Sequence, residues 1–244
     1  MKKFYRHLLG WFLWRTCTRE FDILQALKGK RVAVVGAADT AFQLENGDYI
    51  EKFDIIIRMN RAPYSWKPTH EKFIGKRIDF LFHSFYENEI SGGGVINLKF
   101  FEQFQVQKIV NPNNNIPGKK AHFNFYKRHL KKIHTLILNR SVSKIIHEQF
   151  KEKVPTVGFY ALASALMAET EELYVTGFSF FQTPYGKNYR QDLENLAANK
   201  KHIIEQNLHE PNLELKLFKE FLRKSPSKRI ILDDYLTKYQ AGQS

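Results

Sequence analysis

Short, strongly apolar runs that end in turn residues constrain the fold of this chain most. Residues 31–36 (RVAVVG) and 53–59 (FDIIIRM) show little polar alternation, which is typical of parallel strands covered on both faces. An apolar helical stretch, residues 159–168, and an amphipathic one, residues 213–223, lie among such runs. We therefore predict an α/β fold with a single Rossmann-like parallel sheet and flanking helices. The further runs span residues 79–82, 108–111, 136–138, 172–177 and 229–232.

Length and cysteine content narrow the class of protein. The chain has 244 residues, of which 43% are hydrophobic, so it can bury a full core. Its single cysteine, Cys17, excludes an intramolecular disulfide and a cysteine-built zinc site, which indicates a reducing compartment. The apolar run at residues 8–14 is too short to span a bilayer, and the charges after it do not suit a signal peptide. We expect a cytoplasmic protein.

The first 27 residues form a basic and aromatic segment, and we expect one catalytic domain over residues 28–240. Trp11 and Trp14 lie three positions apart and share one face of a helix. Two interpretations remain open. The helix lies in an anionic membrane interface, with the protein peripheral on the inner face, or it packs its aromatic side on the catalytic body or on a second subunit.

Lysine and arginine (38) exceed aspartate and glutamate (25), which gives a net charge of +13. Such a charge attracts phosphates, nucleic acid or anionic lipid. A nucleic-acid-binding protein would show a helix-turn-helix or an aromatic ribonucleoprotein strand, and the sequence offers neither, so we predict no nucleic-acid partner. The basic segment at residues 119–153 is either a solvated helix face or a surface for an acidic oligosaccharide.

Two strand ends carry candidate ligand contacts. Gly36 opens a turn over residues 36–40, where doubly wound folds bind nucleotides, but the further glycines of a dinucleotide fingerprint are missing. Arg58, Asn60 and Arg61 come at the end of the second strand. An amide suits a ribose or a base and guanidinium groups suit phosphate or carboxylate, although Asn60 also suits a plain turn.

Two further sites are open to more than one interpretation. Thr156 and Gly158 begin a helix whose free N–H groups suit an anionic or cytosine-like group, or form an ordinary N-cap. His209 precedes the amphipathic helix, where an imidazole can act as general base for a sugar hydroxyl, but it is one of nine histidines.

Metal-ligand patterns are missing from the sequence. No histidine shows HExxH or cysteine-assisted zinc spacing, and the pair Asp233-Asp234 lacks the Asp-x-Asp spacing that binds Mn²⁺ or Mg²⁺ against a diphosphate. We predict no metal and no other cofactor.

Three ordered motifs resemble those of the sialyltransferases. Residues 32–63 resemble the long donor-binding motif of the eukaryotic-type family 29, and residues 155–178 resemble its short motif. Residues 209–214 (HEPNLE) are similar to its very short motif, and Gly75 and Arg77 echo a Gly-x-Arg that follows the long motif. Residues 177–181 (GFSFF) are also similar to bacterial family 42 enzymes of lipooligosaccharide synthesis.

The resemblance implies a GT-A-like sialyltransferase variant that transfers sialic acid, with inversion, from its CMP conjugate to a glycan or glycolipid hydroxyl. In it, His209 is the base. Glu214 orients the helix or the imidazole, or else only favours the helix macrodipole. A related ulosonic acid carried on CMP, such as the deoxy-octulosonate, remains open as the donor.

The resemblance also implies positions around the donor. Thr156 and Gly158 hold the cytidine or the donor carboxylate, and Asn60 contacts the nucleotide. Tyr185 and Tyr189 donate hydroxyls to the phosphate, with Lys187 or Arg190 adding positive charge, unless this stretch is a plain surface loop. The remaining donor candidates are Gly36, Thr40 and Arg61.

The sequence departs from the family pattern at two points. Ala37 stands where the family has asparagine, so a donor contact is absent or comes from Asp39 or Thr40. The cysteines that join the long and short motifs in secretory members are missing, as a cytoplasmic bacterial enzyme of lipooligosaccharide or capsule biosynthesis requires.

Overall fold

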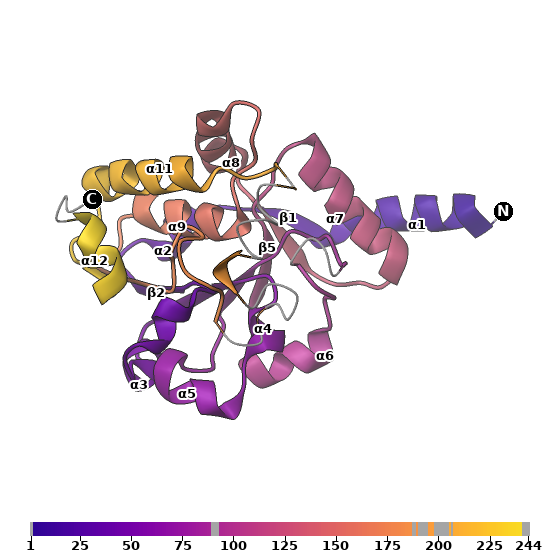
Figure 1. Ribbon diagram of the computed structural model, residues 1–244. Helices are drawn as coiled ribbons and strands as arrows, with labels where there is room; N and C mark the ends of the chain where they lie inside the picture. Colours follow the sequence, from indigo (N-terminus) through magenta and orange to yellow (C-terminus); the bar gives the residue numbers. More distant parts are fainter. Residues whose placement is uncertain are drawn as a thin grey trace.

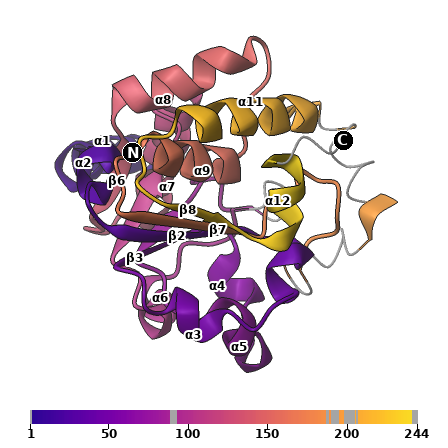
Figure 2. The same cartoon turned by 90° about the vertical axis from the view of Figure 1, so that its left-hand side faces the viewer.

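The computed structural model describes residues 2–88, 93–186, 189, 195–197, 205 and 207–240. Its centre is one eight-stranded sheet in the order β1-β6-β5-β4-β3-β2-β7-β8, and every adjacent pair of strands is parallel. Helices cover both faces of this sheet (Figures 1 and 2). The predicted single Rossmann-like sheet with flanking helices is confirmed.

The strands span Thr18–Phe21 (β1), Arg31–Val35 (β2), Ile55–Met59 (β3), Phe80–Phe82 (β4), Lys108–Asn111 (β5), Thr135–Leu138 (β6), Glu172–Thr176 (β7) and Ile230–Leu232 (β8). The α-helices span Lys2–Cys17 (α1), Ile23–Leu27 (α2), Gly47–Ile50 (α3), Ala62–Ser65 (α4), Glu71–Ile74 (α5), Leu98–Phe101 (α6), Ile116–His129 (α7), Arg140–His147 (α8), Val157–Met167 (α9), Pro211–Lys224 (α11) and Asp234–Gln240 (α12). Short 3-10 helices span Asp39–Phe42 (η1), Pro68–His70 (η2), Glu102–Phe104 (η3) and Glu148–Phe150 (η4).

The strands bury side chains on both faces, because successive residues of a strand point in opposite directions. In β4, Phe80 and Phe82 pack in one core with α8, α9 and α11. Leu81, between them, packs in a second core with residues of α1 and α7. This two-sided burial explains why the strands read as continuous apolar runs.

Helix α9 lies between the sheet and α11 (Figure 2). Its sequence, VGFYALASALM, is apolar or small on every side, which is typical of a helix surrounded by protein. Leu217 and Phe218 of α11 cover its outer side in the same core. Helix α9 leads into β7 and runs antiparallel to the strands. Its first residues therefore lie at the carboxyl edge of the sheet.

The chain reverses its direction of winding at β2. Strands β3 to β6 follow one another on one side of β2, whereas β7 and β8 lie on its other side. The connections that leave β2 and β7 therefore diverge, which opens a crevice at the carboxyl ends of these two strands.

The first 27 residues, which we expected to precede the catalytic domain, contribute to the sheet. Strand β1 pairs with β6, and α2 buries Ile23 and Leu27 completely in the main core. Strand β1 (TREF) escapes prediction because Arg19 and Glu20 are exposed at the edge of the sheet and leave no apolar run. Over the described residues, no helix combines the length and the apolar character needed to cross a membrane.

Candidate active site

A cleft of about 1100 Å³ opens at the carboxyl edge of the sheet. The turns after β2, β3, β4, β5 and β7 line it, as do the first residues of α7 and α9 and one face of α8 along its length. Helix N-termini carry free N–H groups and a partial positive charge. Two of them, those of α7 and α9, lie at this cleft and favour an anionic ligand.

Thr156 and Glu214 join two of the motifs at this cleft. The Thr156 hydroxyl caps α9 by accepting a hydrogen bond from the Phe159 N–H at 2.9 Å. The Glu214 carboxylate accepts the Thr156 N–H at 2.7 Å and its hydroxyl at 3.1 Å. Glu214 is only 3% exposed, and this burial raises its pKa to about 8, although the hydrogen bonds from Thr156 oppose the shift.

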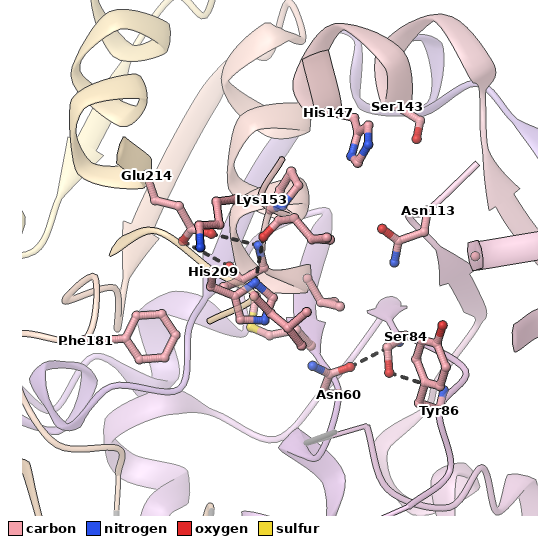
Figure 3. A pocket seen from close by; sticks show the side chains of 18 of the residues that line it. Asn60, Ser84, Tyr86, Asn113, Ser143, His147, Lys153, Phe181, His209 and Glu214 are labelled. Carbon is pink, nitrogen blue, oxygen red and sulfur yellow. Dashed lines mark hydrogen bonds between the residues drawn. The ribbon is translucent and has the colours of Figure 1, made fainter. Parts of the chain in front are cut away.

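His209 lines the cleft with its ring fixed by the backbone (Figure 3). Its Nδ1 lies 2.6 Å from the carbonyl oxygen of Val154, and because a carbonyl only accepts, Nδ1 carries the proton. In the neutral ring the lone pair is then on Nε2. The Val154 N–H in turn donates to the Leu208 carbonyl at 2.8 Å, which ties the His209 segment to the beginning of the short motif.

Asn60 lines the cleft after β3 with a left-handed backbone, φ 48°, which asparagine tolerates better than most residues. Its side-chain oxygen accepts the Ser84 N–H at 3.2 Å. Arg58, two residues earlier, is directed elsewhere. Its guanidinium is buried and donates to the carbonyls of Ile74 and Arg77, and this burial lowers its pKa to about 10.

The structure brings seven of the predicted site residues to the cleft lining and leaves three outside it. Thr40 is buried within η1, and Arg61 lies at the beginning of α4. Gly36 lies where the β2 and β7 turns touch, and a Cβ there would come 2.0 Å from the Gly177 carbonyl oxygen. The seven lining residues are Asn60, Thr156, Gly158, Tyr185, Tyr189, His209 and Glu214.

Tyr185 and Tyr189 form an aromatic wall of the cleft with Phe181. The Tyr185 ring centroid lies 5.0 Å from that of Tyr189 and 6.1 Å from that of Phe181. Lys187 and Arg190, the two cations predicted beside these tyrosines, lie outside the described residues.

Ala37 lines the cleft beside this aromatic wall, and its carbonyl accepts the Gly186 N–H at 2.8 Å. Asp39 and Thr40, the expected substitutes for the family's asparagine, do not reach the lining. The Asp39 carboxylate instead accepts the Thr183 hydroxyl at 2.5 Å.

A polar side of the cleft was not predicted. Figure 3 shows Asn113, Ser143 and His147 together, away from Glu214 and Phe181. The buried side-chain oxygen of Asn113 has no hydrogen-bond partner in the part of the chain that the structure describes. Asn113 could have been found by the rule that identified Asn60, because it follows the end of β5 at the same edge of the sheet.

Among the described residues, no three histidine, cysteine, aspartate or glutamate side chains gather as metal ligands. Asp233 instead has a structural role. Its carboxylate accepts hydrogen bonds from the N–H of Gly177 and the hydroxyl of Thr176, both at 2.9 Å. It thereby fixes the turn after β7 that lines the cleft.

A cleft that offers helix N-termini to a phosphate and an imidazole to a hydroxyl group suits the transfer of a sugar from a nucleotide. Fold and site together define a glycosyltransferase. A sequence model of glycosyltransferase family 29 (sialyltransferase) matches residues 16–225, which is most of the chain. The protein therefore belongs to family 29, the sialyltransferases, and the predicted family is confirmed.

Solved sialyltransferases share this fold. CstII from Campylobacter jejuni, in complex with the substrate analogue CMP-3FNeuAc, aligns with a TM-score of 0.53 and 17% identity over 85% of this chain and 88% of its own. Cst-I from the same organism gives 0.53 and 16% over 87% and 79%. A mammalian sialyltransferase gives 0.56 and 12% over 90% and 77%. A search of curated proteins found no significant match.

Proposed function

We propose that this enzyme transfers sialic acid from CMP-sialic acid to a hydroxyl group of a glycan or glycolipid, with inversion at the anomeric carbon. Membership of family 29 supports the reaction class. The similar CstII structures hold CMP-3FNeuAc in one case and CMP with a trisaccharide acceptor in another, which supports the donor and the kind of acceptor.

The observation that carries the proposal is the hydrogen bond from His209 Nδ1 to the Val154 carbonyl at the cleft wall. It leaves the lone pair of the neutral imidazole on Nε2. In the proposed step Nε2 takes the acceptor's proton while the acceptor oxygen bonds to the anomeric carbon. The bond from that carbon to the phosphate oxygen breaks, and CMP leaves with the electron pair. A single displacement of this kind inverts the anomeric carbon.

The donor side of the cleft begins at α9. The free N–H groups of the first turn, with Thr156 as the N-cap and Gly158 without a side chain, suit a phosphate or the donor carboxylate. Asn60 offers an amide from the end of β3, and we place the nucleotide against it. Tyr185 and Tyr189 supply hydroxyls toward the leaving phosphate. Gly36, Thr40 and Arg61 lie outside the cleft lining, so we assign them no contact with the donor.

We propose that Glu214 is a positioning residue. Its described hydrogen bonds go to Thr156, so it acts on the N-terminus of α9. In this role the carboxylate holds the donor-binding end of α9 and does not orient the imidazole of His209.

Leaving-group stabilisation by protein groups makes a metal unnecessary in this scheme, in line with the lack of an Asp-x-Asp motif. We expect full activity in a chelating buffer. Complete loss that Mn²⁺ restores would contradict this expectation.

The test is CMP release measured side by side with CMP-sialic acid and CMP-deoxy-octulosonate. We expect turnover of the first, and a loss of about 10²-fold or more in His209→Ala, because proton transfer is removed. His134→Ala is the matched control, since His134 is exposed and lies outside the cleft lining. Turnover of CMP-deoxy-octulosonate alone would favour the related ulosonate donor, and equal rates in His209→Ala and wild type would refute the base.

A further inference from the structure

Helix α1 has two faces of opposite character. One face packs on α7, where Leu13 and Cys17 are 3% and 4% exposed and the Trp14 ring lies edge-on to Phe123 at 6.3 Å. Gly10 lies so close to α7 that a Cβ would come 2.7 Å from Lys127 Cγ. This contact fixes the rotation of α1 about its axis.

The opposite face is apolar and uncovered. At 3.6 residues per turn, residues 4, 8 and 11 follow one another along the helix, with 5 and 12 beside them. Figure 1 shows α1 at one end of the molecule, extending beyond α7 toward its N-terminus. The five side chains and their exposed fractions are Phe4 75%, Tyr5 62%, Leu8 56%, Trp11 50% and Phe12 52%.

This concentration is unusual for a surface. Other exposed large apolar side chains in the described residues, such as Leu44, Leu98 and Ile145, belong to separate elements. Scattered residues of this kind are normal, whereas a contiguous aromatic face indicates an interaction surface.

Charge identifies the partner. Residues 2–19 contain no aspartate or glutamate. Arg15 follows 4, 8 and 11 on the exposed face, Lys3 and Arg19 lie near the two ends of the helix, and Arg6 donates instead to the carbonyls of Lys127 and Arg128. The net charge of the whole chain is +13. A second copy of this chain would bring like charges together, whereas an anionic bilayer attracts the cations and accepts aromatic rings at its headgroup level.

We propose that the exposed face of α1 inserts into the interfacial region of a membrane that carries anionic lipids and holds the enzyme at that surface. For an enzyme in the cytoplasm, this surface is the inner leaflet. The helix lies along the membrane rather than across it, because its other face is occupied by α7. Both interpretations of the N-terminal segment then hold, each for one face of α1. The packed face contacts α7, and the exposed face contacts the membrane.

The test is co-sedimentation with vesicles of phosphatidylcholine alone and of phosphatidylcholine with phosphatidylglycerol. Wild type is expected to bind the anionic vesicles and to be released by high salt. The variant Leu8→Ser/Trp11→Ser/Phe12→Ser should bind at least about tenfold more weakly, because its apolar face is lost. The control Leu44→Ser/Leu98→Ser/Ile145→Ser alters side chains of similar exposure outside α1 and should bind like wild type.

Donor hydrolysis in solution, without vesicles, is expected to be equal in all three proteins and shows that each is folded. Equal vesicle binding by wild type and the α1 variant would overturn the proposal. So would a wild-type dimer that the α1 variant converts to monomer with no change in vesicle binding, since the face would then join two copies. Neither result depends on whether sialic acid is the sugar transferred.

Discussion

The carboxylate of Glu214 accepts two hydrogen bonds from Thr156, from the N–H at 2.7 Å and from the hydroxyl at 3.1 Å. The two residues belong to different motifs, at the beginnings of α11 and α9. The same hydroxyl accepts the Phe159 N–H, so one buried acid supports the N-cap of a helix whose first turn lines the cleft. His209, five positions before Glu214, reaches the cleft from the same connection.

Glu214→Gln should make the protein less sensitive to pH. Burial raises the pKa of Glu214 from 4.5 to about 8, so between these values the folded state binds more protons than the unfolded state. The free energy of unfolding of the wild type therefore falls as pH rises through this window, and the glutamine variant lacks this contribution. Denaturant unfolding from pH 5 to pH 9 should show the difference, variant minus wild type, increasing with pH.

Parallel curves for the two proteins would show that Glu214 does not titrate in this window.

The activity of Glu214 variants gives a second readout. Glutamine keeps an acceptor for the Thr156 N–H, so Glu214→Gln should retain most activity, whereas Glu214→Leu should lose it and raise KM for the donor. A purely structural residue would lower the amount of folded enzyme without moving KM.

Substitution by alanine should have opposite effects on stability at Gly158 and at Gly36. A Cβ on Gly158 would lie 3.5 Å from Phe178 Cε1, an ordinary contact, so Gly158→Ala should be neutral or up to about 1 kcal/mol more stable. It should nevertheless raise KM for the donor if the ligand approaches the backbone there. A Cβ on Gly36 would meet the Gly177 carbonyl at 2.0 Å, so Gly36→Ala should destabilise by about 1–3 kcal/mol or more. Thermal unfolding and donor kinetics, measured together, separate the two roles.

Much of this architecture is readable from the sequence, because the strands are buried on both faces and leave uninterrupted apolar runs. The same logic places Asn60 at the cleft. It does not distinguish Asn60 from Arg61, since neighbouring residues leave a strand end in different directions and the turn decides which one faces the ligand. Arg58, predicted at the same edge, instead satisfies two backbone carbonyls within the protein.

The pairing of Glu214 with Thr156 was not predictable either. Spacing within a motif indicates that a carboxylate follows a histidine, but its direction depends on the packing of α11 on α9 through Leu217 and Phe218. These contacts join segments far apart in the chain. Local patterns carry no information about them.

Ala37→Asn should strengthen donor binding. Ala37 lines the cleft at the position where the resemblance places asparagine, and its methyl group offers no hydrogen bond. An amide there adds donors and an acceptor at the wall of the cleft. We expect KM for the donor to fall several-fold with little change in stability, measured against Ala37→Leu as a control of similar size. If both variants weaken donor binding equally, the size of the side chain at position 37 determines donor binding, and its polarity does not.

The basic face of α8 should select for an acidic acceptor. Arg140, Lys144 and His147 of α8 line the cleft. Figure 3 shows His147 near Ser143, on the side away from Glu214. Lys144 is only weakly engaged, since its partner Glu148 lies 3.5 Å away and both side chains are about 60% exposed. Arg140→Ala/Lys144→Ala should therefore raise KM for an acceptor that carries a carboxylate or phosphate, and added salt should do the same to the wild type, because both weaken the attraction between charges. A neutral acceptor of the same size and donor hydrolysis without acceptor are the matched readouts, and both should stay unchanged. Equal losses with charged and neutral acceptors would assign α8 to the shape of the cleft and not to charge recognition.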